Sequence, residues 1–242
     1  MSERTSVQWR RLVMESIAIL LSILVAFAID AAWDARRERA EEAEILQALR
    51  KDFLANQLTA TDVVQTHGAN AALYAVFASL TPTEVMALPQ DSLDVITRSM
   101  SGPYTFDPVR GTIDALIGAG KLGLIRNRPL REALVTFLNL VDDAREDAEF
   151  LGRAAERVWA KEVLHGGPWS ASAAGKFEIG NGRAAFLDPI DRETLAGVRT
   201  DVQMMGLIKQ FHATAATYSS EVARVVAQID SVLVLLQGSD AE

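Results

Sequence analysis

An apolar run near the N-terminus constrains this chain more than any other feature. Residues 12–32 are apolar or small except for Glu15 and Asp30. A helix of about 20 such residues, at about 1.5 Å per residue, matches a hydrocarbon layer about 30 Å thick. The run therefore predicts one transmembrane helix over residues 12–32, with both acids close enough to its ends to reach the interfaces.

Aromatic and basic side chains flank the run on both sides. Tryptophan rings favour the headgroup level, and arginines beside an apolar run extend toward water. The predicted membrane-interface residues are Trp9, Arg10, Arg11, Trp33, Arg36 and Arg37. A cleaved signal peptide is the alternative, because a basic start, an apolar stretch and Ala-Phe-Ala at 26–28 supply its three parts. We favour the spanning helix, since the run continues without a break into a helical pattern.

The orientation of the helix depends on a nearly even count of arginines. They are Arg4, Arg10 and Arg11 before the run and Arg36, Arg37 and Arg39 after it. We expect residues 1–11 to form a cytoplasmic tail and residues 33–242 to form a single helical bundle domain, mostly periplasmic, in a bacterial inner membrane. A signal peptide would export the same domain.

Small residues recur every four positions inside the run, at Ala18, Ser22 and Ala26, and Asp30 continues the series. Small side chains at this spacing let a second membrane helix approach closely, which predicts a homo-oligomer formed through the anchor. The alternative is that alanine is simply common in this chain.

Apolar residues recur at helical spacing in three long segments beyond the run. The first continues from the membrane helix toward Gly68, the second covers about 130–158 and the third about 191–237. The stripe of the third segment is Leu195, Val198, Val202, Met205, Ile208, Phe211, Ala215, Tyr218, Val222, Val225, Ile229, Val232 and Leu236. Because each stripe must be buried, we predict an all-α fold: the N-terminal transmembrane helix continues into an elongated antiparallel bundle with three long helices and several short ones.

Shorter segments lie between the long ones. Residues 68–80 are typical of a helix, and Thr81 with Glu84 gives a capping-box start to another, which Pro89 separates from a helix ending near residue 101. Residues 102–111 predict a loop. Asn181-Gly182 can close a small β-hairpin near 177–186.

Three glycines, Gly118, Gly120 and Gly123, have the G-x-G-x-x-G spacing of a dinucleotide-binding turn. That turn must open a helix that holds the pyrophosphate, but Pro129 follows too soon, and no strand-helix alternation supplies a parallel sheet. We predict a structural joint instead. A short helix from about Thr112 ends in glycines with positive φ, an extended connector covers residues 122–125, and Asn127 caps the next helix. The joint residues are Gly118, Gly120, Gly123, Asn127, Pro129 and Arg131.

Composition and the remaining motifs favour no catalytic chemistry. The chain has no cysteine and a formal net charge of -8, so thiol chemistry is excluded and nucleic acid is not an expected partner. Glu162-x-x-His165 has the spacing of a di-iron ligand pair, but His212 has Lys209 where a second pair needs glutamate. We therefore predict no catalytic residue, metal or cofactor.

Two phrases of the sequence carry a family resemblance. They are the anchor with the charged helix after it, residues 12–53, and a later phrase comprising Thr112, Leu116, Gly120, Leu122, Leu124, Ile125, Asn127, Leu130, Arg131 and Leu134. Together they resemble a group of uncharacterised bacterial single-pass membrane proteins. Gly118 departs from that group, which has serine or a similar small residue there. The resemblance implies membrane association, a helical fold and no assigned reaction.

These observations favour a non-enzymatic, membrane-anchored interaction or scaffold protein. Its expected partners are the lipid bilayer and an unidentified protein. A sensor-like helical bundle that binds a small ligand is the alternative, and an enzyme with an unrecognised site is the third hypothesis.

Overall fold

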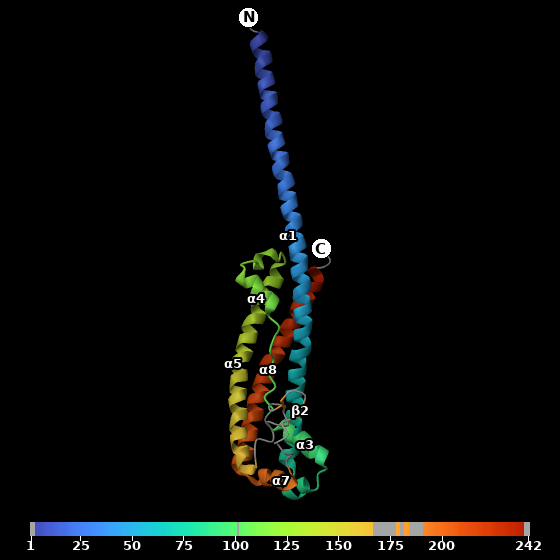
Figure 1. Ribbon diagram of the computed structural model, residues 1–242, viewed down its shortest axis with the longest axis vertical. Coiled ribbons are helices and arrows are strands. Elements are labelled where there is room, and N and C mark those ends of the chain that lie inside the picture. The colour runs from blue at the N-terminus through green and yellow to red at the C-terminus, as the bar shows by residue number, and fades with distance from the viewer. Residues whose placement is uncertain (1–2, 101, 167–177, 180–181, 184–190, 240–242) are drawn as a thin grey trace.

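The protein is an elongated helical bundle from which one helix projects far beyond the rest (Figure 1). The computed structural model describes residues 3–100, 102–166, 178–179, 182–183 and 191–239. These residues form seven α-helices, so the predicted all-α fold is confirmed. The three long helices are α1 (Glu3–Ser79), α5 (Arg128–Glu162) and α8 (Val202–Ser239).

The first helix, α1, is unbroken over 77 residues and about 115 Å at about 1.5 Å per residue. The helix expected separately over residues 68–80 is its last part. Gly68 lies inside α1, where a glycine costs roughly 1 kcal/mol relative to alanine. Burial of nearby side chains such as Val63 and Phe77 offsets that cost.

The core lies where α8 packs against both α1 and α5. In Figure 1, α1 and α5 run in the same direction and α8 runs opposite to both. The rings of Phe53 on α1 and Phe137 on α5 are 4.7 Å apart, and both are buried. Each large apolar side chain buried in this way contributes about 1.5–3 kcal/mol to stability.

The third long segment is not one helix, and this prediction was wrong at Asp201. The chain forms α7 (Arg192–Thr200), an extended residue at Asp201 and then α8. Asp201 Oδ1 accepts the N–H groups of Gln203 (2.9 Å) and Met204 (3.0 Å), so its side chain caps a new helix. The break interrupts the apolar stripe locally. Val202 is 85% exposed and Met204 is buried in place of Met205, whereas the predicted stripe is buried again from Ile208 onward.

Short elements close the bundle at the end far from the N-terminus. Thr81 caps α2 (Pro82–Met86) through the predicted capping box, and α3 (Gln90–Ser99) follows. Helix α2 packs against α7, and α3 packs against α1.

A short antiparallel pair joins β1 (Glu178–Ile179) to β2 (Gly182–Arg183). The two strands pair within the range expected for the hairpin, near 177–186, but Gly182 lies in a strand and not in the expected turn. Residues 177, 180–181 and 184–186 of that range lie outside the described ones.

Residues 102–110, the return segment, carry the chain back along the bundle from α3 to α4 (Gly111–Gly118) (Figure 1). The segment has no regular structure, as predicted, but its backbone is paired by side chains of the bundle. Asn56 accepts the Val109 N–H (2.7 Å) and donates to the Val109 carbonyl (2.9 Å). The Phe106 N–H donates to the Tyr218 hydroxyl (2.7 Å). The Tyr218 bond satisfies a buried main-chain N–H, and the two Asn56 bonds hold the segment to α1 at Val109, whose side chain is exposed.

Replacing Asn56 tests this arrangement. Asn56 is fully buried, and Asn56→Leu leaves both Val109 groups unpaired, at about 1–3 kcal/mol each. We expect unfolding of the detergent-solubilised protein, followed by circular dichroism, to show a loss of roughly 2–5 kcal/mol. The neighbouring exposed amide gives the control, because Gln57→Ala should change stability by less than about 1 kcal/mol. Equal effects of the two variants would contradict the role of Asn56.

Candidate functional site

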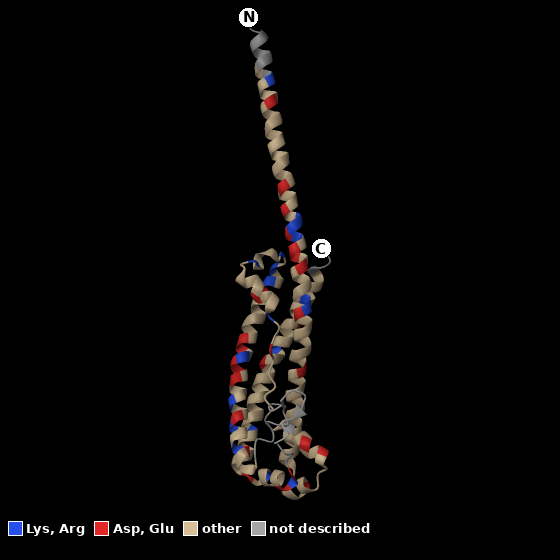
Figure 2. Ribbon diagram, viewed as in Figure 1, with Lys and Arg blue, Asp and Glu red and all other residues tan. Residues whose placement is uncertain are grey.

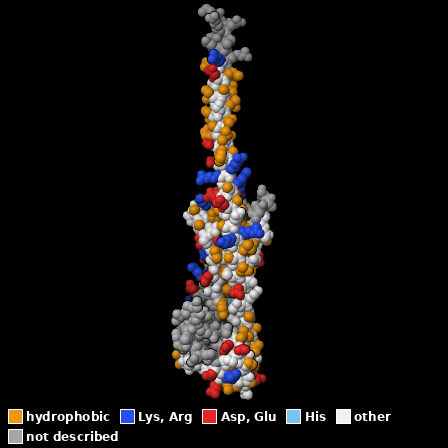
Figure 3. Space-filling model, turned by 45° about the vertical axis from the view of Figure 1, so that its right-hand side comes forward, with side chains coloured by type: hydrophobic (Ala, Val, Ile, Leu, Met, Phe, Trp, Pro, Cys, Tyr) orange, Lys and Arg blue, Asp and Glu red, His pale blue; other side chains and the backbone are white. Residues whose placement is uncertain are grey.

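The N-terminal third of α1 stands clear of the bundle, with its apolar side chains exposed (Figure 3). Among the described residues this is the one helix long and apolar enough to cross a membrane. Trp9 and Trp33, each 69% exposed, lie at its two ends. They are 24 residues apart in one helix, about 36 Å, which exceeds a hydrocarbon layer of about 30 Å by a small margin.

Four polar side chains at the start and middle of this segment are paired within the helix. The Ser16 hydroxyl donates to the Leu12 carbonyl (2.9 Å), and the Ser22 hydroxyl donates to the Ala18 carbonyl (2.8 Å). Arg11 Nε lies 3.1 Å from Glu15 Oε1. Such internal pairing lowers the cost of placing polar groups in an apolar medium. Ala18, Ser22, Ala26 and Asp30 are all exposed, and Arg10, Arg36 and Arg37 occupy the ends of the segment on α1.

A charged neck, residues 34–40, separates the apolar segment from the bundle (Figure 2). The bundle begins near Glu41, eight residues after Trp33, or about 12 Å along the helix. Arg36 and Arg37 belong to this neck, and both are exposed.

The predicted joint lies at the end of the bundle next to the neck. Helix α4 ends in a Schellman motif, because the Lys121 N–H donates to the Leu116 carbonyl (2.8 Å) and the Gly120 N–H to that of Ile117 (3.0 Å). Gly120 has φ +66°, which favours glycine. Gly118 is the last residue of α4, while Gly123 lies in a 3-10 turn, η1 (Leu122–Leu124), so residues 122–124 are not the extended connector that we expected.

The start of α5 is fixed by its own side chains. Asn127 Oδ1 accepts the Leu130 N–H (3.1 Å), and Pro129 occupies the first turn, where its missing N–H costs nothing. The Arg131 guanidinium donates to the carbonyls of Ile125 and Arg126. Arg131 thereby holds the joint against the helix that follows it.

Three acidic residues of α1 connect α1 to the joint and to the start of α4. Glu41 Oε1 lies 2.6 Å from Lys121 Nζ, and this hydrogen bond lowers the pKa of the Glu41 carboxyl. Glu42 accepts the Arg126 N–H (2.6 Å) and pairs with its guanidinium (3.4 Å). Deeper in the bundle, Asp52 Oδ2 accepts the Thr112 hydroxyl (2.6 Å) at the start of α4.

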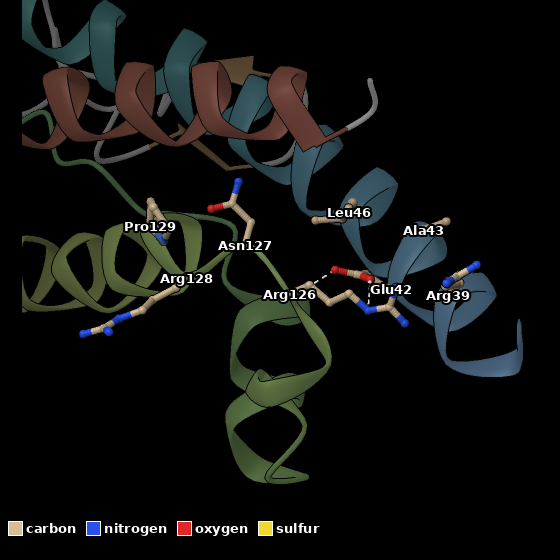
Figure 4. Close-up of a pocket in the computed structure, with 8 residues that line it drawn as sticks. All are labelled: Arg39, Glu42, Ala43, Leu46, Arg126, Asn127, Arg128 and Pro129. Carbon is tan, nitrogen blue, oxygen red and sulfur yellow. Dashed lines mark hydrogen bonds and ion pairs between the residues drawn. The ribbon is translucent and has the colours of Figure 1, made fainter. Parts of the chain in front are cut away.

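A groove of about 800 Å³ lies between α1 and the start of α5 (Figure 4). It is lined by Arg39, Glu42, Ala43, Leu46, Arg126, Asn127, Arg128 and Pro129. Glu42 faces Arg126, whereas the Arg128 side chain points away from α1 and pairs with Glu132 (2.8 Å). Because its carboxylate is bound to the Arg126 guanidinium and N–H, Glu42 holds the joint to α1.

Two histidines lie inside the bundle. His67 on α1 is buried, and its Nε2 lies 2.8 Å from the Tyr104 carbonyl of the return segment. His212 on α8 stacks on Tyr74 with the rings 4.4 Å apart. Burial lowers the pKa of His67, and burial together with the nearby His67 lowers the pKa of His212 to about 4. Both imidazoles are therefore neutral at pH 7.

The third histidine, His165, lies where α5 meets α7 and α8. Its Nε2 and Lys161 Nζ each lie 3.2 Å from Asp201 Oδ2. The N–H of Met204 holds the pKa of the Asp201 carboxyl well below its usual range, and hydrogen bonds from His165 and Lys161 act in the same direction. Glu162, the other half of the Glu-x-x-His spacing, is buried. No group of three potential metal-ligating side chains occurs among the described residues.

No family model matches the sequence, and no curated protein or solved structure matches it either. The site must therefore be interpreted from its own geometry.

Sequence reasoning missed the polar side chains that hold distant segments together. In the sequence, nothing distinguishes Asn56, His67 and Tyr218 from other residues of helical segments. Their hydrogen-bond partners lie in the return segment. Asp201 did carry a signal, because aspartate is among the best residues for capping a helix.

The two glycines of the joint allow a matched test. Gly120→Ala forces a side chain into left-handed backbone and should destabilise the protein by about 1–2 kcal/mol. Gly123→Ala meets no atom within 4 Å at a negative φ and should be close to neutral. Urea unfolding of both variants measures the difference, and equal stabilities would refute the joint as described.

The buried histidines predict a pH dependence of stability. A His212 pKa near 4 in the folded state, against about 6.5 when unfolded, gives stability that is complete above pH 6.5 and declines as the pH falls toward 4. Between pH 7 and 5, protonation of His212 should lower the free energy of unfolding by about 2 kcal/mol.

His212→Phe keeps an aromatic ring against Tyr74. We expect this variant to show a smaller difference in urea midpoint between pH 7 and pH 5 than the unmodified protein. Phe211→Leu is the control, since it perturbs the same region without removing a titrating group. It should lower the stability by the same amount at both pH values. An unchanged slope in His212→Phe would contradict the assignment.

Proposed function

We propose that this protein is a bacterial inner-membrane protein with one spanning helix, whose bundle lies in the periplasm and acts as a non-enzymatic interaction module. The observation that carries the proposal is the continuity of α1. One unbroken helix contains both the exposed apolar segment and a full side of the bundle core. A bundle built this way is positioned rigidly with respect to whatever holds the apolar segment.

The apolar segment supports a membrane as its surroundings. Apolar side chains from Leu12 to Ile29 are exposed around the helix, and a surface of that size in water favours association or insertion. Its length and its flanking tryptophans and arginines suit a bilayer. The family resemblance leads to the same expectation.

The charged groups of the bundle support an interaction module over an enzyme. Glu42, Asp52 and Asp201 all accept backbone N–H groups at helix ends or joints, and Glu41 pairs with Lys121. His67 bonds to a backbone carbonyl. These side chains hold the fold, which leaves them unsuited to act on a substrate.

Single cysteines test both anchoring and orientation, because the natural chain has none. Ser220 lies exposed on α8, and Ser6 precedes the apolar segment. In intact cells, a membrane-impermeant maleimide should label Ser220→Cys and leave Ser6→Cys protected until lysis. Both chains should stay with membranes after alkaline extraction.

The remaining outcomes separate the alternatives. Labelling of Ser6→Cys alone would reverse the orientation. A mature chain that has lost its first residues, seen by intact mass, would indicate a cleaved signal peptide. Release of the full chain by alkaline extraction would contradict the spanning helix.

A further inference from the structure

One buried imidazole holds the return segment against the bundle. His67 on α1 is 4% exposed, and its Nε2 lies 2.8 Å from the Tyr104 carbonyl. A carbonyl oxygen can only accept, so Nε2 carries the hydrogen and the neutral ring donates it. Two residues further on, the Phe106 N–H donates to the Tyr218 hydroxyl (2.7 Å). Residues 104–106 are therefore bonded to α1 and α8 through these two side chains.

The surroundings of His67 favour its neutral form. The rings of Tyr218 and Tyr104 lie 5.7 and 6.3 Å from the imidazole, nearly perpendicular to it. Burial lowers the pKa of His67, and the bond to the Tyr104 carbonyl opposes that effect only in part. The other titratable and charged groups around this layer are Tyr74 on α1, His212 and Tyr218 on α8, Tyr104 and Asp107 on the return segment and Arg199 on α7.

None of these groups compensates a proton on His67. Asp107 is exposed, and its charge acts on Tyr218, whose pKa it raises. Arg199 is a cation, and its guanidinium donates to the carbonyls of Ala78 and Leu80. His212 has a pKa that is lowered by His67, so the two imidazoles repel each other when both are charged. A proton on the buried ring of His67 would therefore be an uncompensated charge.

Movement of residues 102–106 away from the bundle removes the Tyr104 contact and exposes His67 to water. The exposed ring binds a proton with an ordinary pKa of about 6.5, whereas the covered ring has a lower pKa. The closed segment is thus fully stable above that pH and loses stability as the pH falls below it.

The far end of the return segment is held by side chains other than histidine. Asn56 pairs with both main-chain groups of Val109, and an amide does not titrate. Arg110 pairs with Asp142 on α5 (3.2 Å). Release of residues 102–106 therefore leaves the segment attached to the bundle at Val109 and Arg110.

We propose that His67 is a pH-sensitive latch, whose protonation in mildly acidic medium releases residues 102–106 from α1 and α8 while the helices of the bundle stay folded. Release exposes the Phe106 side chain, which is 9% exposed in the closed form. The bundle thereby gains an apolar surface that depends on pH, as histidine switches do in other proteins. The latch is independent of the proposed function and would regulate any contact made at this surface.

Hydrogen exchange of the full chain in detergent micelles tests the latch, with overlapping peptides and correction for the intrinsic effect of pH. Between pH 7 and pH 5 we expect protection of residues 102–106 to fall about 5- to 25-fold. The upper value is the limit for a ring that binds no proton when covered. Protection there should stay below that of α5 at both pH values, as opening without unfolding requires.

Three variants assign the response to one imidazole. The amide of His67→Gln can donate to the Tyr104 carbonyl but does not titrate, so protection should be retained at pH 7 and fall less than about twofold at pH 5. His212→Phe removes the other buried imidazole of this layer and should keep the response. His165→Gln is the matched control, because it makes the same substitution outside this layer, and should also keep it.

Histidine-ring NMR of the natural chain provides a test that does not depend on a variant of His67 being folded. The His67 ring should be the neutral Nε2–H form at pH 7, and its protonated form should appear together with the loss of protection. Protonation without that loss would overturn the latch. A response that persists in His67→Gln or disappears in His212→Phe would do the same. Protection that is independent of pH, or equal to that of α5, would also contradict it.

Discussion

Two long helices that run in the same direction require the chain to return along the bundle between them, and the rest of this fold depends on how that return is paired. The return segment has no regular structure, and one main-chain bond, from the Tyr104 N–H to the Gly102 carbonyl (3.0 Å), lies within it. Asn56, His67 and Tyr218 supply further partners from α1 and α8. With the segment held, α4 and the joint form beside the neck, and α8 can lie antiparallel to both α1 and α5.

Features that depend on neighbouring residues could be predicted from the sequence, and features that depend on distant ones could not. The capping box of Thr81 and Glu84 joins residues three apart, and the apolar stripes repeat every three or four residues. The bonds of the return segment join residues 53 and 112 positions apart, and no local pattern indicates them. The break at Asp201 was missed for a different reason. Helical periodicity continues on both sides of it, because Val198 before the break and Ile208 after it are both buried as the stripe predicts, so the period gave no sign of the capping side chain.

The three glycines with the spacing of a dinucleotide-binding turn each have a different structural role. Gly118 ends a helix, Gly120 provides the left-handed residue of the Schellman motif, and Gly123 lies in a 3-10 turn. Other residues of the same phrase have equally structural places: Leu116, Ile125, Leu130 and Leu134 are buried. The later of the two phrases that carry the family resemblance therefore describes a joint. A resemblance carried by a joint informs about architecture and leaves chemistry open.

If α1 spans a bilayer as proposed, its continuity determines what the far end of the bundle can reach. Val76, near that end, follows Trp33 by 43 residues in one helix, or about 65 Å. Membrane helices tilt by about 20° on average, and a rigid rod of about 65 Å tilted by that angle moves its far end sideways by roughly 20 Å. The height of the far end above the membrane changes by only about 4 Å over the same range. The helix thus fixes the height of the far end of the bundle while leaving its lateral position free, which suits a partner held at a defined distance from the same membrane.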